Sequence, residues 1–73
     1  MSFFEQLRKD GFTRRESEIC ELLVSGKPRK NIADDLKISI HTLDIFLAKI
    51  RAKLCVETTF QAGLALAKMG LEK

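Results

Sequence analysis

The predicted fold depends most on residues 27–53, which read KPRKNIADDLKISIHTLDIFLAKIRAK. After a basic start, Ile32, Ala33 and Leu36 recur with helical spacing, and a brief break over residues 37–39 separates them from a longer apolar pattern. The stretch therefore predicts two helices joined by a tight turn, which can present the outer side of the second helix to a large ligand.

Capping signals and apolar spacing predict the remaining helices. Thr13 with Glu16, and Thr58 with Gln61, form capping-box patterns, and Ser39 suits a helix N-cap. The expected helices cover residues 14–25, 28–36, 40–54 and 59–69, with Gly26 and Gly70 as stops and Pro28 in a first turn. Phe3, Phe4 and Leu7 share one side of a short extra N-terminal helix that ends by Gly11. The expected fold class is all-α, a compact four-helix helix-turn-helix domain with that short extra helix.

The length of 73 residues predicts a single domain over residues 1–73. Within it we expect an N-terminal extension over 1–11, the helix-turn-helix over 28–54 and a last helix within 58–70. Thirteen basic residues against ten acidic ones give a net charge of only +3, so the placement of the charges carries more information than their sum. No apolar run approaches the roughly 20 residues of a membrane span, and we predict no membrane partner.

Few side chains suit catalysis or metal binding. Cys20 and Cys55 lack metal-ligand spacing and suggest reduced thiols in the cytoplasm, and Cys20 suits a small core residue. His41 has no acidic or nucleophilic partner at useful spacing. The carboxylates Glu16, Glu18 and Glu21 are interpreted as helix-start and surface charges. The sequence predicts no catalytic site, no metal and no cofactor.

The helix expected over residues 40–54 has two contrasting sides. Its apolar side consists of Leu43, Phe46, Leu47, Ile50 and Leu54. The opposite side carries His41, Asp44, Ile45, Ala48 and Ala52. Short side chains such as alanine allow a helix to enter a DNA major groove about 12 Å wide. We therefore predict that His41, Asp44, Ile45 and Ala48 face the bases; the alternative is an ordinary solvated helix surface.

Basic and hydroxyl side chains flank that outer side. Thr42, Lys49 and Lys53 lie along one edge, and Arg29 and Lys30 begin the preceding helix, where backbone amides already favour an anion. Such groups can meet phosphates, which position a protein on DNA without carrying sequence information. We predict phosphate contacts for these five residues, with an ordinary solvated turn as the alternative for the basic start.

Several segments in register resemble one family. They are FTRRESEI (residues 12–19), LLVSG (22–26), KNIADDLKIS (30–39), TL (42–43) and IRAKLCV (50–56), followed by an alanine-rich last helix. Together they resemble the LuxR-type helix-turn-helix domain, also called GerE- or NarL-type, over about residues 12–71. The resemblance implies double-stranded DNA as partner and transcription regulation as function. It also implies DNA contacts by Arg29, Lys30, Thr42, Asp44, Ile45, Ala48, Lys49 and Lys53, and dimerisation through the last helix.

Two positions depart from the family pattern. Asp44 stands where the family usually has a basic residue, so either the preferred DNA site differs or sequence reading is weakened. Cys55 stands at a helix end that often holds Gly or Asn, and a positive φ there would be strained.

The last helix is apolar on two sides. One stripe consists of Ala62, Ala65, Leu66 and Met69, and the other includes Phe60, Leu64 and Ala67. A domain this small does not readily bury both. We expect the side formed by Phe60, Gly63, Leu64 and Ala67 to make a homodimer, weak in the isolated domain. The alternative is that Phe3, Phe4 and Leu7 fold back to cover it.

Two functions remain open at this stage. The first is sequence-specific binding of double-stranded DNA in the bacterial cytoplasm, in association with the nucleoid. The chain would then be the output end of a larger regulator with an N-terminal sensory or receiver domain, or a small stand-alone regulator. The second is a degenerate helix-turn-helix that binds protein or dimerises, with weak or no DNA reading.

Overall fold

The structure, a computed structural model, describes residues 2–71 with the exception of the Leu71 side chain. The described part is built from the helices α1 (Phe3–Lys9), α2 (Arg14–Val24), α3 (Arg29–Leu36), α4 (Ile40–Leu54) and α5 (Thr59–Leu71). The predicted all-α class, the helix-turn-helix and the short N-terminal helix are confirmed. Met1, Glu72 and Lys73, which belong to the predicted domain, lie outside the described residues.

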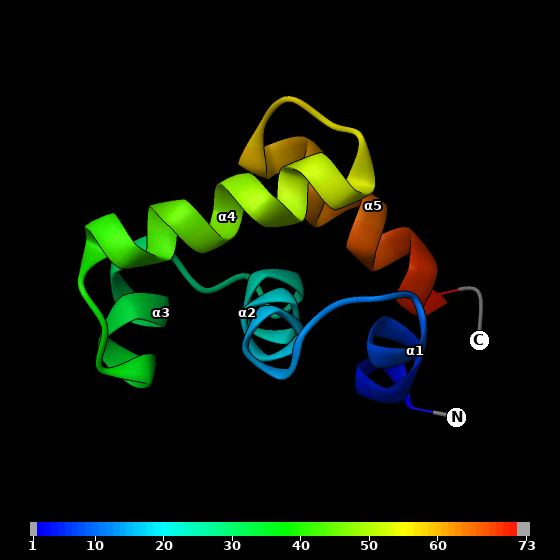
Figure 1. The fold of residues 1–73 in the computed structure, drawn as a ribbon, viewed down its shortest axis with the longest axis horizontal. Coiled ribbons are helices and arrows are strands. Elements are labelled where there is room, and N and C mark those ends of the chain that lie inside the picture. The colour runs from blue at the N-terminus through cyan, green and yellow to red at the C-terminus, as the bar shows by residue number, and fades with distance from the viewer. Residues whose placement is uncertain (1, 72–73) are drawn as a thin grey trace.

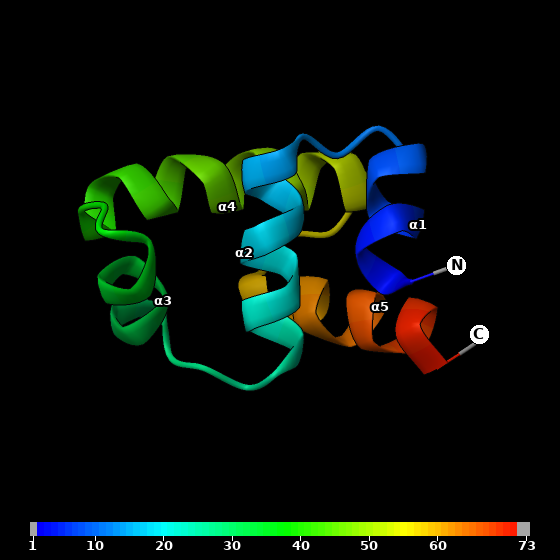
Figure 2. The ribbon, with the colours of Figure 1, turned by 90° about the horizontal axis from the view of Figure 1, so that it is seen from below.

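α2 lies beneath α4 in Figure 1 and crosses in front of it in Figure 2. It packs against α1, α3 and α5, while α4 packs against α3 and α5. α1 and the end of α5 lie side by side at the end of the molecule opposite α3. In Figure 1 no helix lies above the N-terminal half of α4, whereas the loop to α5 and the start of α5 are drawn above its C-terminal half.

Side-chain caps explain where the helices begin. The Thr13 hydroxyl accepts a hydrogen bond from the Glu16 amide, and the Glu16 carboxylate accepts one from the Thr13 amide. The same reciprocal bonds join Thr58 and Gln61. Ser39 Oγ accepts from the Thr42 amide at the start of α4. All three predicted caps are therefore present, and Ser2 with Glu5 forms a further capping box that was not predicted.

Three predicted boundaries are wrong. α2 ends at Val24, so Ser25 is its C-cap, and Pro28 is the N-cap of α3 because its ψ of 154° is extended. Gly70 does not end α5, which continues to Leu71. A Cβ built on Gly70 would lie 3.7 Å from Phe3 Cδ1, so packing against α1 supports a helical turn where local propensity predicts a stop.

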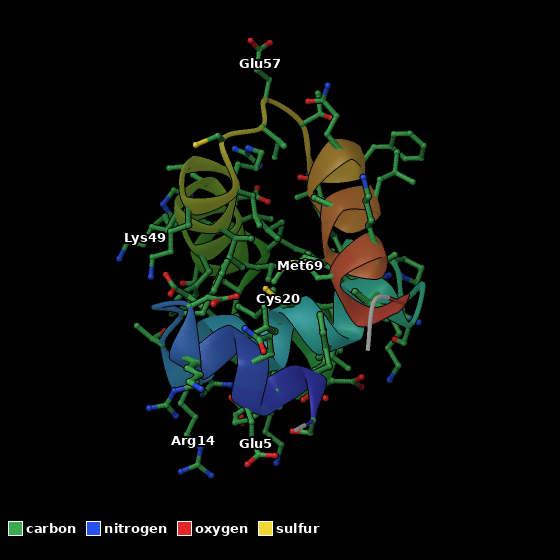
Figure 3. All side chains as sticks on the ribbon, turned by 90° about the vertical axis from the view of Figure 1, so that its right-hand side faces the viewer. Glu5, Arg14, Cys20, Lys49, Glu57 and Met69 are labelled. Carbon is green, nitrogen blue, oxygen red and sulfur yellow. The ribbon has the colours of Figure 1, made fainter. Side chains whose placement is uncertain are left out.

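The core collects the predicted apolar stripes of every helix. Its buried members are Leu7, Phe12, Ile19, Cys20, Ile32, Ala33, Leu43, Leu47, Ile50, Ala62 and Leu66. Cys20 points into the interior in Figure 3, and burial raises the pKa of its thiol to about 12, with the Glu16 charge adding to the rise. Cys20 therefore stays protonated and acts as a core residue, as predicted.

Cys55 and Lys37 end α4 and α3 in the left-handed region, with φ of 58° and 57°. Cys55 thus has the positive φ that the sequence analysis identifies as strained for a residue other than glycine. A side chain with a Cβ is strained in this conformation by roughly 1–2 kcal/mol, which glycine avoids.

We predict that Cys55→Gly raises the free energy of unfolding by about 1 kcal/mol, because it relieves this strain. Urea denaturation followed by circular dichroism measures the change. The matched control is Ala48→Gly in the exposed middle of α4, which should lower stability by about 1 kcal/mol. A Cys55→Gly variant no more stable than the parent would contradict the account of the helix end.

Candidate nucleic-acid interface

The turn between α3 and α4 is held by backbone and side-chain hydrogen bonds. Lys37 in the left-handed conformation lets the Ile38 amide donate to the Ala33 carbonyl at 3.0 Å. Ser39 then caps α4 through its bond with Thr42. α3, this turn and α4 form the helix-turn-helix unit that the sequence predicts.

The inner side of α4 is anchored in the core, which fixes the direction of its outer side. Leu43, Leu47 and Ile50 are essentially inaccessible to solvent. Of the predicted base-facing residues, His41, Ile45 and Ala48 are exposed and Asp44 is partly exposed. Ile45 is a large apolar residue left on the surface. This outer row is thus available for a ligand and does not pack within the chain.

The predicted phosphate contacts lie on both edges of this row. Arg29 and Lys30 are exposed at the start of α3, where Pro28 supplies no side-chain cap and the first turn carries no acidic residue. Backbone amides in a first helical turn have no acceptor within the helix. The start of α3 therefore combines two cationic side chains with amides that can donate to an anion.

On the other edge, Lys49 is exposed and points away from the molecule in Figure 3, with its ammonium 5.9 Å from the centre of the Phe46 ring. The Thr42 hydroxyl accepts a hydrogen bond from Ser39 Oγ at 3.0 Å. Thr42 is consequently part of the α4 cap as well as a member of the predicted edge.

Asp44 does not stand alone on the outer side. Its Oδ1 lies 3.5 Å from Nη1 of Arg29, so the carboxylate at the unusual position forms an ion pair with the first residue of α3. The sequence placed the two residues in the same interface but did not predict their contact.

Lys53 makes a tertiary contact that the sequence did not predict. Its ammonium donates to Glu16 Oε1 at 2.6 Å and to the Gly11 carbonyl at 2.9 Å, and lies 5.4 Å from the centre of the Phe12 ring. These contacts join the last turn of α4 to the start of α2. Lys53 is thus a structural residue in addition to its predicted place on the phosphate edge.

Glu16 is a helix-start charge, as predicted, since it completes the capping box of α2, but it is not on the surface because the residue is only 3% exposed. Burial raises the pKa of its carboxyl, but hydrogen bonds from Lys53 and Thr13 and the Lys53 charge outweigh burial, and the net pKa is lowered. A buried carboxylate keeps its charge here because the Lys53 ammonium and the Thr13 backbone amide donate to it.

The second stripe of α5 remains outside the core. Phe60 is 75% and Leu64 57% exposed, while Ala62 and Leu66 on the first stripe are buried. Leu7 enters the core and Phe3 lies against Gly70 at the far end of α5, so the alternative in which the N-terminal helix covers the second stripe is wrong for these two residues.

A hollow of about 350 Å³ adjoins the second stripe between α2 and α5. It is lined by Leu23, Val24, Gly26, Lys27, Thr59, Phe60, Gly63 and Leu64. The sequence predicted the contribution of α5 to this surface, but not that of Val24 and Lys27, whose role depends on how the two helices pack.

Other kinds of site find little support in the described part of the chain. Residues 2–71 contain no group of three or more His, Cys, Asp or Glu side chains placed to hold a metal ion. No described helix has the length and hydropathy needed to cross a bilayer. The surface formed by the exposed outer row of α4 and the basic start of α3 is therefore the main candidate site.

This combination of fold and surface defines a helix-turn-helix regulator of the DNA-binding class. Residues 10–65 match the family described as "Bacterial regulatory proteins, luxR family". The chain is also 41% identical over 58 residues to the spore germination protein GerE of Bacillus subtilis (strain 168), covering 80% of this chain and 78% of the relative. No solved structure gives a significant match. The chain therefore belongs to the luxR family of DNA-binding transcription regulators.

The lowered pKa of Glu16 predicts how acid destabilises the protein. A carboxyl whose folded pKa lies below its unfolded value stabilises the fold at higher pH, and this contribution is lost as the pH falls through the folded pKa. At pH 7 we expect Lys53→Met to lower the free energy of unfolding by about 1–3 kcal/mol. This loss is smaller than the loss expected for breaking a fully buried ion pair, because the Lys53 side chain is 36% exposed.

Urea denaturation at pH 7 and pH 3 tests this expectation. At pH 3 the parent and Lys53→Met should differ less, since a protonated Glu16 no longer needs the cation. Lys68→Met, at an exposed position of α5, is the control and should change stability by less than about 0.5 kcal/mol. An equal difference at the two pH values would show that Glu16 is not the group that Lys53 stabilises.

Proposed function

We propose that the domain reads specific sequences in double-stranded DNA by placing α4 in the major groove. The observation that carries this proposal is the outer row of α4, whose residues His41, Ile45 and Ala48 are exposed while the opposite side of the same helix is buried. Short or flat side chains at the closest approach suit a groove about 12 Å wide. The proposed place of action is the cytoplasm, at the nucleoid.

In this arrangement the start of α3 crosses the DNA backbone. Arg29 and Lys30, together with the first-turn amides, would contact phosphates on one side of the groove. Thr42, Lys49 and Lys53 would contact phosphates on the other side. An ammonium has three donors, and the bonds of Lys53 to Glu16 and Gly11 use two, so we assign the third to phosphate.

A second candidate function is a degenerate helix-turn-helix that works through protein contacts. It is favoured by the exposed Phe60 and Leu64 beside an apolar hollow, and by the carboxylate of Asp44 on the DNA-facing side. The two candidates differ in how DNA affinity responds to salt. Counterion release makes log affinity fall with log salt, with a slope of about −0.9 for each phosphate neutralised.

We expect the parent domain to bind duplex DNA with such a slope. Lys30→Ala should weaken binding to all sequences alike and flatten the slope by roughly one unit. Ala48→Glu should abolish binding because it adds length and negative charge at the closest approach, while circular dichroism shows the fold unchanged. Fluorescence anisotropy with labelled duplexes measures both effects.

The control is Lys68→Ala on α5, which should retain the parental affinity and slope. If the parent binds DNA without salt dependence, or if Ala48→Glu binds like the parent, α4 is not the reading helix and the second candidate function takes its place.

We further propose that the domain forms a weak homodimer through Phe60, Gly63, Leu64 and Ala67 of α5. The exposed apolar stripe supports this surface. Gly63 has no side chain to hold a second helix away, and the space beside it is open, since a Cβ there would meet no other atom within 4 Å. A two-fold dimer would place two copies of α4 about 34 Å apart, one turn of DNA, and favour an inverted repeat. A single helix pair buries little area, so the isolated domain should dimerise mainly on DNA.

Phe60→Asp should remove this dimer without unfolding the domain, because Phe60 makes little contact with the core. We expect it to bind a single half-site like the parent but to lose cooperative binding to an inverted repeat. Sedimentation velocity with and without DNA measures the change. Parental cooperativity in Phe60→Asp would place the dimer surface elsewhere.

A further inference from the structure

The ion pair between Arg29 and Asp44 joins the two helices of the helix-turn-helix. Arg29 is the first residue of α3, and Asp44 lies in the second turn of α4, beside the exposed Ile45. Nη1 and Oδ1 are 3.5 Å apart, and the two side chains are 52% and 46% exposed. Both groups thus remain accessible to a ligand that approaches α4.

The position of this pair constrains which group meets the DNA. A carboxylate alone on this surface would repel phosphates, but a guanidinium within 3.5 Å neutralises its charge. A guanidinium carries five N–H donors, so the contact with one carboxylate oxygen leaves donors for a second acceptor. Because Asp44 belongs to the outer row of α4, its partner is held at the rim of the surface that enters the groove.

We propose that Asp44 is a positioning residue that acts through Arg29. The carboxylate holds the guanidinium at the rim of the groove-facing surface, where Arg29 donates to O6 and N7 of a guanine in place of the phosphate contact first assigned to it. Arg29 is then a specificity-determining residue, and the acidic residue at position 44 contributes to sequence reading without contacting a base. This inference rests on the proposed DNA binding and names the chemistry of one base contact.

A double-mutant cycle on the preferred DNA site tests the proposal. Selection from random duplexes gives that site for the parent, for Arg29→Ala, for Asp44→Ala and for the double variant. Arg29→Ala should lose the preference for guanine at one position and weaken binding to the parental site by roughly 5- to 150-fold. Asp44→Ala should relax discrimination at that same position, and Asp44→Asn, whose amide oxygen still accepts from Arg29, should restore part of it.

The sign of the Asp44→Ala effect is the most specific result. With Arg29 present, Asp44→Ala should lower the affinity for the parental site, because the guanidinium is no longer positioned. In the Arg29→Ala background the same change should raise affinity, because only a repulsive carboxylate is removed. Thermal unfolding of all variants shows whether the fold is retained, and a purely structural pair would not change the preferred base.

A matched control is available in the Arg15–Glu18 pair of α2, which has a similar separation of 3.6 Å and similar exposure. In a double-mutant cycle of Arg15 and Glu18, the effects of the two single changes on DNA affinity should be additive. The preferred DNA site should stay the same.

Three results would overturn the inference. Higher affinity of Asp44→Ala in both backgrounds would show that Asp44 only repels DNA. An unchanged base preference in Arg29→Ala would assign Arg29 to phosphate alone. Loss of a cytosine preference on Asp44→Ala, with or without Arg29, would mean that the carboxylate itself contacts a base. In each case the parent still binds DNA, whereas a parent without salt-dependent binding overturns the proposed function as well.

Discussion

The last turn of α4 is fastened to the start of α2 by the contact between the Lys53 ammonium and the buried Glu16 carboxylate. α2 supplies the carboxylate from its capping box, so the group that begins one helix also fastens the end of another. Burying a carboxylate is costly unless a cation and hydrogen bonds compensate, and here Lys53 and the Thr13 amide do so. Apolar packing holds the middle of α4, and this ion pair holds its last turn against the start of α2.

α4 serves both stability and the proposed DNA binding, because its inner side packs in the core and its outer side is exposed. Leu43, Leu47 and Ile50 hold the inner side of α4, and the turn over residues 37–39 sets its start against α3. His41, Ile45 and Ala48, which would face the bases, therefore need no packing role of their own. Arg29 and Asp44 add a contact between α3 and α4 at the rim of the outer side of α4. There the charge of Asp44 and the position of the Arg29 guanidinium can together affect which DNA sequence is preferred.

Local signals in the sequence predicted most of the fold. The Thr13–Glu16 and Thr58–Gln61 capping boxes, the Ser39 cap and the apolar stripes of the helices are all present, because each depends on residues three or four positions apart. Apart from the end of α2 and the start of α3, the errors concern contacts between distant residues. Glu16 is buried through a partner 37 positions away, and Gly70 stays helical where Phe3 packs against it. The edges of the candidate site stay a prediction, and the Arg29–Asp44 and Lys53–Glu16 contacts could be found only from the tertiary structure.

The central claim is that the outer side of α4 is the surface that DNA contacts. Titrating the isotopically labelled domain with duplex DNA, and following its backbone amide resonances by nuclear magnetic resonance, tests this claim residue by residue. The largest shifts should fall on residues 41–49 of α4 and residues 29–31 of α3. Shifts confined to the hollow between α2 and α5, with α4 unperturbed, would contradict the account.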